Sequence, residues 1–233
     1  AGGGWGSSLL SFLSSLWGRR GAATTTRFWL FLHSLGETVA ISLIGTLTAA
    51  VLAFPFGFLA AKNVMTQRVL HFLTRRGLDT IRGVDTLIWA LIWINVVGLG
   101  PFAGILAIMS SDFGSFGKLF SEAVEAVDGK PIEGVTSTGG SRLAQIRFAI
   151  LPQILSVIAG QVLYYFESNT RSATIIGIVG AGGIGMYLTE AIRTLEWQQV
   201  SLLVLMILVA VAIIDQISAR IRFAVIGERR IET

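Results

Sequence analysis

Residues Glu133 to Pro152 read EGVTSTGGSRLAQIRFAILP and form a polar, basic stretch between two long apolar runs. Within this stretch, apolar residues recur at about helical spacing, at Val135, Leu143, Ile146 and Ala149. Gly139 and Gly140 interrupt the pattern, which predicts two short helices that meet at a glycine bend. Pro152 falls where the next apolar run begins, and a first helical turn tolerates proline because the N–H that it lacks would be unpaired there. A helix pair joined in this way to a membrane helix can act as a lever.

The composition of the chain is typical of an integral membrane protein. Hydrophobic residues make up 53% of it, charged residues make up 14%, and the mean hydropathy is +0.71, which is far more apolar than a soluble domain. The lack of cysteine excludes disulfides and thiolate metal sites, and the two histidines, His33 and His71, are too isolated to predict a metal cluster. The net charge of +4 does not indicate nucleic acid, because the 18 basic residues are scattered around apolar runs.

Five apolar runs predict transmembrane helices. A helix that crosses a hydrocarbon core of roughly 30 Å needs about 20 mostly apolar residues, because backbone polar groups find no water there. The predicted spans are Leu35 to Ala61, Val84 to Gly98, Phe102 to Val127, Phe148 to Glu167, and Val200 to Arg222. The third run contains Asp112, which we expect to break or cap a helix rather than to line a path, since Ser and Asp favour such sites.

The lysines and arginines near the span ends predict the orientation. One set of connections holds twelve of them: Lys62, Arg68, Arg75, Arg76, Arg82, Lys130, Arg142, Arg147, Arg220, Arg222, Arg229 and Arg230. The opposite set holds five: Arg19, Arg20, Arg27, Arg171 and Arg193. Because basic residues are enriched on the cytoplasmic side, we expect a multi-pass protein with the first set in the cytoplasm. The N-terminus of this chain is then outside and its C-terminus inside.

Residues 1–34 are expected to form an extracytoplasmic or interfacial segment. Leu9 to Trp17 fits an interfacial helix about as well as a disordered tail. The chain does not begin with Met, and an N-terminus outside the cell is easiest to understand if a further span precedes it. We expect the membrane domain to cover residues 35–226, with its cytoplasmic loop at about 128–147, and residues 227–233 to form a cytoplasmic tail.

The stretch quoted first resembles the cytoplasmic coupling loop of ABC importer permeases. That loop carries the pattern E-A-A, three residues, G, nine residues, I-x-L-P. The positions retained in this chain are Glu133, Gly139, Leu151 and Pro152. The departures are Gly134 and Val135 in place of the two alanines, and Ala149 in place of the isoleucine.

Three further stretches resemble the permease subunit of phosphonate ABC importers. They are VVGLGPFAGILA (Val96 to Ala107), LFSEAVEAV (Leu119 to Val127) and YYFESNTRSATIIGIVGAGGIG (Tyr164 to Gly185). The similarity runs from about Thr38 to Arg222. It implies an all-α integral membrane protein of the bacterial inner membrane, a type I ABC importer permease-like helical bundle with about five transmembrane helices visible plus a cytoplasmic coupling helix.

The resemblance also implies the partners. A second permease subunit, expected to be an identical copy, would complete a gated path through the lipid bilayer. Two cytosolic ATP-binding subunits would grip the coupling helices, and an extracytoplasmic phosphonate-binding protein would deliver the substrate. This chain is expected to be non-catalytic and to bind no metal or cofactor, since ATP and Mg are used by the partner ATPase. Neither Gly117-Lys118 nor Gly129-Lys130 completes the phosphate-binding pattern G-x-x-x-x-G-K-[ST].

The resemblance assigns ATPase coupling to five residues of the loop: Glu133, Gly139, Arg142, Leu151 and Pro152. Glu133 is expected to cap a helix or to form a salt bridge at the ATPase contact. Gly139 is expected to supply a bend that a side chain would block.

The candidates for the translocation path or outer gate are Glu167, Ser168, Asn169, Arg171 and Ser172. Glu167 and Arg171 are four residues apart, so they can pair on a helix and fix its position near the outer end of a span. Alternatively, Arg171 meets an anionic phosphonate, with Ser168, Asn169 and Ser172 as hydrogen-bond donors. Both interpretations stay open.

Gly180, Gly182, Gly183 and Gly185 form a glycine-rich run that matches G-x-G-x-x-G. A dinucleotide-binding turn would need a preceding strand and an acidic residue about 20 positions later, and the sequence predicts neither. We expect these glycines to allow close packing or to lie at a subunit interface.

Three other functions agree with some of these sequence features. An ABC permease for a different small solute, such as phosphite or an amino acid, would have the same architecture, because a separate binding protein largely sets selectivity. A secondary transporter is less favoured, since no internal duplication is visible. A membrane enzyme would need a reactive group of side chains, and the sequence shows no such group.

Overall fold

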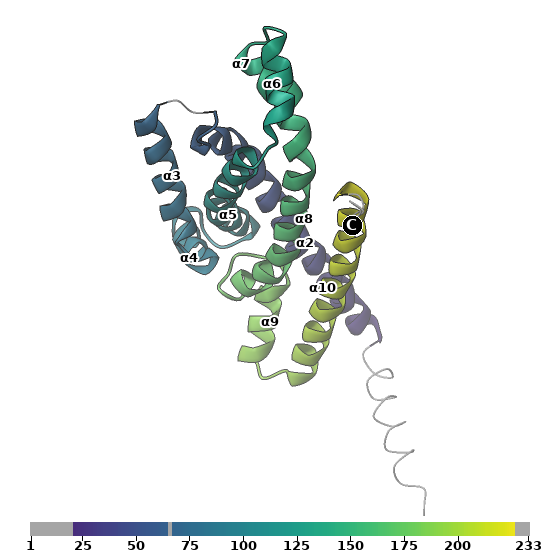
Figure 1. The fold of residues 1–233 in the computed structure, drawn as a ribbon. Helices are drawn as coiled ribbons and strands as arrows, with labels where there is room; N and C mark the ends of the chain where they lie inside the picture. Colours follow the sequence, from purple (N-terminus) through teal and green to yellow (C-terminus); the bar gives the residue numbers. More distant parts are fainter. Residues whose placement is uncertain (1–20, 65–66, 227–233) are drawn as a thin grey trace, which may run out of the picture.

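The computed structural model describes residues 21–64 and 67–226, and these residues are helical with short connections (Figure 1). The helices are α2 (Gly21–Ala60), α3 (Arg68–Arg82), α4 (Thr86–Val97), α5 (Pro101–Glu125), α6 (Gly129–Ser137), α7 (Arg142–Gln145), a π-helical turn η1 (Ile146–Ile150), α8 (Leu151–Ile178), α9 (Ile184–Arg193) and α10 (Trp197–Ile226). No strand occurs among the described residues.

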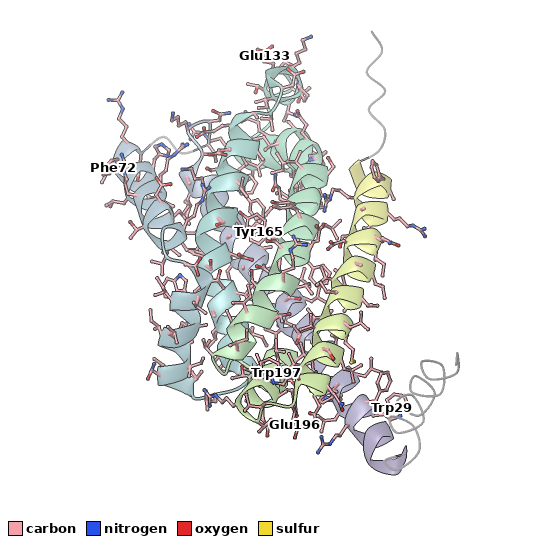
Figure 2. The ribbon with its side chains drawn as sticks, turned by 90° about the horizontal axis from the view of Figure 1, so that it is seen from below. Trp29, Phe72, Glu133, Tyr165, Glu196 and Trp197 are labelled. Atoms are coloured by element: carbon pink, nitrogen blue, oxygen red, sulfur yellow. The ribbon has the colours of Figure 1, made fainter. Side chains whose placement is uncertain are left out.

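The long helices form a bundle with two distinct ends. Glu133 of α6 lies at one end, which we call the α6 end, and Trp29, Glu196 and Trp197 lie at the other, which we call the α9 end (Figure 2). The short helices α6 and α7 extend beyond the bundle at the α6 end (Figure 1). The expectation for Leu9 to Trp17 concerns residues outside the described range.

Three described helical stretches are long and apolar enough to cross a membrane, at Arg27–Ala60, Arg142–Ile178 and Trp197–Ala224. A fourth crossing is obtained if α3 and α4, which are bent by 87° at their junction, count as one broken span. The predicted span from Val84 to Gly98 is therefore wrong as a single crossing. The 12 residues of α4 extend only roughly 18 Å, which is shorter than the hydrocarbon core.

The predicted third span corresponds to α5, which is long enough to cross but not apolar enough to count among these stretches. The reason is its position, because α5 packs against α2, α3, α4 and α8 and is enclosed by protein. An enclosed helix does not need a lipid-compatible surface. The expectation that Asp112 breaks or caps a helix is also wrong, since α5 runs without interruption through Asp112, whose side chain is buried.

Two predicted spans are shorter than the helices in the structure, because polar residues were taken as the ends of the spans. Helix α2 begins at Gly21 rather than near Leu35, and the Glu37 carboxylate within it accepts a hydrogen bond from the backbone N–H of Gly183 at 3.2 Å. Helix α8 continues to Ile178, so Glu167 lies inside the helix and not at its outer end. A charged side chain that has a partner in the protein does not end a membrane helix.

Glycines let the helices around α5 approach closely. A Cβ at Gly57 of α2 would lie 2.6 Å from Cβ of Phe120, and a Cβ at Gly114 of α5 would lie 2.6 Å from the backbone N of Arg82 and 2.8 Å from the carbonyl oxygen of Leu78. Small residues at such crossings increase van der Waals contact between membrane helices. The packing of α3 on α5 therefore depends on the missing side chain at Gly114.

Substitution of Gly114 tests this contact. We expect Gly114→Ala to lower the free energy of unfolding by about 1–3 kcal/mol, because the added Cβ meets backbone atoms of α3 that cannot rotate away. The measurement is thermal unfolding of the purified protein in detergent. Gly77→Ala is the control, since a Cβ there meets nothing within 4 Å and alanine favours a helix. Equal or higher stability of Gly114→Ala would contradict the packing argument.

Candidate functional site

Hydrogen bonds hold the start of the loop at the α6 end against the first turn of α8. Asp128 caps α6 by accepting a hydrogen bond from the backbone N–H of Lys130 at 3.1 Å. The backbone N–H of Asp128 in turn donates to Oε1 of Gln153 at 3.0 Å, and Nε2 of Gln153 donates to the carbonyl oxygen of Ala149 at 2.8 Å. Gln153 thereby holds the start of α6 against the first turn of α8.

The bend between α6 and α7 lies at Gly139 and Gly140. Gly139 has a φ of +77°, and the N–H of Gly140 donates to the carbonyl oxygen of Val135 at 3.0 Å, which closes the end of α6. A Cβ at Gly139 would meet nothing within 4 Å, so a side chain there would disfavour the bend through the backbone conformation and not through a clash. The backbone conformation is what favours glycine there. Space is limited at Gly140, where a Cβ would lie 2.6 Å from Cγ1 of Val135.

The loop presents a polar and apolar surface beyond the bundle. Glu133 and Pro152 are exposed, and Leu151 is half-buried. Leu143 and Phe148, which are not among the predicted coupling residues, are 78% and 66% exposed. An exposed leucine beside charged residues, on a short helix beyond the bundle, favours contact with another protein.

Ion pairs join α8 to α10 at the middle of the bundle. Arg222 Nη2 lies 2.8 Å from Oε2 of Glu167, and Arg171 Nη1 lies 3.3 Å from Oδ1 of Asp215. The expected pair of Glu167 and Arg171 along α8 has a longer separation of 3.7 Å. We call these four residues the charge ladder. Asp215 and Arg222 are not among the predicted site residues, although their seven-residue separation on an apolar helix places them on one face.

The candidate path residues of α8 lie on two different faces. Asn169 is buried toward α2 and α5, where its Nδ2 donates to Thr46 Oγ1 at 2.8 Å and to Oδ2 of Asp112. The expectation that Asn169 shares a surface with Arg171 is therefore wrong. Ser168 and Ser172 are half-buried. Ser168 stands three residues before Arg171 and shares its face of α8, whereas Ser172 follows Arg171 directly and is turned about 100° away from it.

The glycine-rich run joins α8 to α9 at the α9 end. Gly180, Gly182 and Gly183 have φ values of +107°, +87° and +73°, which L side chains rarely adopt. The N–H of Ile184 donates to Oγ1 of Thr38 at 2.8 Å, beside the bond from Gly183 to Glu37, so α2 caps the start of α9.

The same run is packed against backbone on two sides. A Cβ at Gly182 would lie 2.8 Å from Cα of Pro101, and a Cβ at Gly177 would lie 3.0 Å from Cα of Gly185. Close packing within this chain therefore accounts for Gly182 and Gly185 without a ligand.

Comparison with protein families adds the decisive observation, because residues 53–226 match the family described as binding-protein-dependent transport system inner membrane component. The chain belongs to this family. It is the permease component of an ABC importer and a multi-pass membrane protein, as the coupling-loop pattern predicted.

Curated relatives of the permease carry names from the transport of phosphorus compounds. The HtxC protein of Stutzerimonas stutzeri, provisionally named a phosphite transport system permease, is 37% identical over 201 residues, which cover 86% of this chain and 71% of HtxC. The PhnE2 protein of Escherichia coli strain K12, provisionally named a cryptic phosphonate transport system permease, is 46% identical over 118 residues, which cover 51% of this chain and 97% of PhnE2.

The fold of the permease is also found among solved structures. An inward-facing structure of the MetNI methionine ABC transporter matches with a TM-score of 0.72 over 86% of this chain and 98% of that chain. At 19% sequence identity this similarity speaks for the fold alone. The predicted fold class, an all-α permease of the ABC importer type, is confirmed.

A double-mutant cycle tests the charge ladder. Arg171→Gln and Asp215→Asn should each lower the free energy of unfolding by only about 1 kcal/mol, since the two side chains are 46% and 39% exposed in this chain. The loss of unfolding free energy in the double variant should be smaller than the sum of the two single losses, because neither charge is then left unpaired at membrane depth. Thermal unfolding in lipid nanodiscs provides the measurement, and Arg193→Gln on the exposed side of α9 is the control. Strictly additive losses would show that the pair does not interact.

Proposed function

We propose that this permease carries phosphonate, or a closely related phosphorus oxyanion such as phosphite, across the plasma membrane, driven by a separate ATPase that contacts the loop of α6 and α7. The coupling to the ATPase is supported by one observation. Residues Arg142–Ile178 form one continuous helical stretch that passes from the exposed loop into the bundle. Force applied at α7 therefore reaches the middle of the membrane through a rigid element. The names of HtxC and PhnE2 support the substrate class.

The loop surface suits a protein partner. We assign the ATPase contact to Glu133 and Arg142, with the exposed apolar Leu143 between the two short helices. Gly139 sets the angle between α6 and α7, while Leu151 and Pro152 begin the membrane helix that receives the movement. ATP and Mg are bound by the ATPase in this proposal, and this chain contributes neither the phosphate-binding loop nor a metal ligand to them.

The full transporter in this proposal contains two permease subunits, two cytosolic ATP-binding subunits and an extracytoplasmic binding protein. Two identical permeases are the simplest arrangement. The α6 end faces the cytoplasm, because its connections hold or adjoin Lys62, Arg68, Lys130, Arg142 and Arg147 of the larger basic set. The N-terminal side of α2 and the α9 end then face the binding protein.

The path for the anion runs along the α10 side of α8. Arg171 and Ser168 share this side because they are three residues apart, and Glu167 lies between the two arginines of the charge ladder. The pairing of Arg171 does not exclude contact with substrate, because an exchangeable ion pair can open toward a second anion.

The glycine bend provides a test of coupling. We expect Gly139→Val to reduce ATP-driven uptake at least about fivefold, because a left-handed backbone costs a β-branched residue about 1–2 kcal/mol. Gly139→Asn should retain most activity, since asparagine tolerates this conformation. Uptake into proteoliposomes and co-purification of the ATPase are the two measurements. Gly134→Ala in α6, where a Cβ meets nothing within 4 Å, is the control. Full coupled uptake by Gly139→Val would contradict the role of the bend.

Substrate class is tested with the complete transporter. The purified complex of permease, ATPase and binding protein should take up radiolabelled methylphosphonate or phosphite into proteoliposomes with ATP inside. Sulfate should be a poor substrate, and vesicles with ADP in place of ATP provide the control. A complex that hydrolyses ATP and transports another class of solute, such as an amino acid, but neither phosphorus oxyanion would overturn the proposed substrate.

A further inference from the structure

A cavity of about 590 Å³ lies on the face of α8 next to α10, between the charge ladder and the α6 end. Helix α8 contributes Gln153, Ser156, Gln161 and Tyr164 to its lining, and α10 contributes Arg222. Helices α8 and α10 run beside each other in both views (Figures 1 and 2). The lining thus combines these polar side chains with the apolar surface of Val157 and Gly160.

The polar residues of this face recur at intervals of three residues, with one interval of five. Gln153 and Ser156 are followed by Gln161, Tyr164 and Glu167, so they form one stripe along α8. Polar side chains at membrane depth are costly when they face lipid, and they usually line a path or meet a polar partner. A stripe of this length indicates a surface built for water and a polar solute.

The guanidinium group of Arg222 is the positively charged group in the lining of the cavity, and not all of its N–H groups have an acceptor. Its Nη2 donates to Glu167 at 2.8 Å, and its Cζ lies 5.9 Å from the centre of the Tyr164 ring. Its Nε is buried and has no hydrogen-bond partner among the described residues. A buried N–H without an acceptor is costly, and a small rotation of the Arg222 side chain toward the cavity would let an oxyanion accept from it. Planar guanidinium groups bind phosphorus oxyanions through two parallel N–H bonds.

The charge around the cavity is balanced. Arg222 and Arg171 face Glu167 and Asp215, so the charge ladder has no net charge. A transport site has to release what it binds, and an unopposed pair of arginines would hold a multiply charged anion too firmly. Glu167 limits the affinity because it competes with the anion for Arg222.

We propose that this cavity is a low-affinity oxyanion site on the cytoplasmic half of the path. Arg222 is the cationic contact, Gln161 and Ser156 are hydrogen-bond donors, and Glu167 is a built-in competitor. The location follows from two observations. Gln153 in its lining is bonded to Asp128 at the start of the coupling loop, and Arg222 lies four residues before the end of α10 at Ile226. The site rests on the proposed function, because the ligand is the transported anion and the loop marks the ATPase side.

Such a site predicts inhibition from the product side. In proteoliposomes with ATP sealed inside, the lumen is the ATPase side, and luminal methylphosphonate should slow further uptake by occupying the cavity. We expect Arg222→Gln to raise the half-inhibitory luminal concentration about tenfold, since it removes a charge-assisted hydrogen bond. Glu167→Gln should lower that concentration, because the competitor loses its charge. A purely structural ion pair would not give shifts of opposite sign.

The controls separate the site from the stability of the complex. Arg220→Gln removes the same charge from an exposed position two residues away and should leave the inhibition unchanged. Gln161→Leu alters the lining without touching the charge ladder, and it should also weaken inhibition. If Arg222→Gln fails to assemble with the ATPase, Gln161→Leu decides the question.

The outcomes also separate the site from the proposed function. Uptake of methylphosphonate without luminal inhibition, or with the same inhibition in wild type and Gln161→Leu, would overturn the site and leave the proposed function standing. Wild-type complex that takes up no phosphorus oxyanion would remove the proposed function, and the site with it.

Discussion

Polar side chains on α8 have to find partners at a depth where water is scarce, and this requirement determines how the helix sits in the bundle. One side of α8 bonds through Asn169 to Thr46 and Asp112 in the core. The other side pairs through Glu167 and Arg171 with α10. Rotation of α8 about its axis would break both sets of contacts at once, so the polar groups fix its orientation more strictly than apolar packing alone.

The start of α8 explains the Leu-Pro end of the coupling-loop pattern. Pro152 has no N–H, so it cannot bond to the carbonyl oxygen four residues earlier in a regular helix. The five residues before Leu151 form the π-helical turn η1, in which the backbone adjusts to wider hydrogen bonding. The helix direction therefore continues from α7 into α8 without a break, and the local irregularity is confined to the point where the loop meets the bundle.

The sequence was sufficient for those features that depend on local pattern. Apolar content identified a membrane protein, and the glycines at 139 and 140 located the bend of the loop. Features that depend on distant partners were not predictable in this way. Asp112 resembled a helix breaker because Asn169 is 57 residues away, and Arg171 was assigned a local partner because Asp215 is 44 residues away. The short α4 was likewise misjudged, since only the assembled bundle shows that it is bent by 87° against α3.

The two ends of α8 differ in how they respond to movement. At the α9 end, glycines bring the backbones of α8 and α9 into contact, and a Cβ at Gly177 would already overlap the chain beside it. Backbone atoms in close contact leave little room for displacement. In the middle, the charge ladder consists of long side chains that can keep contact while the helices shift by part of a turn. A tilt imposed through α7 is therefore resisted at the glycine junction and accommodated between α8 and α10, beside the cavity that Arg222 lines.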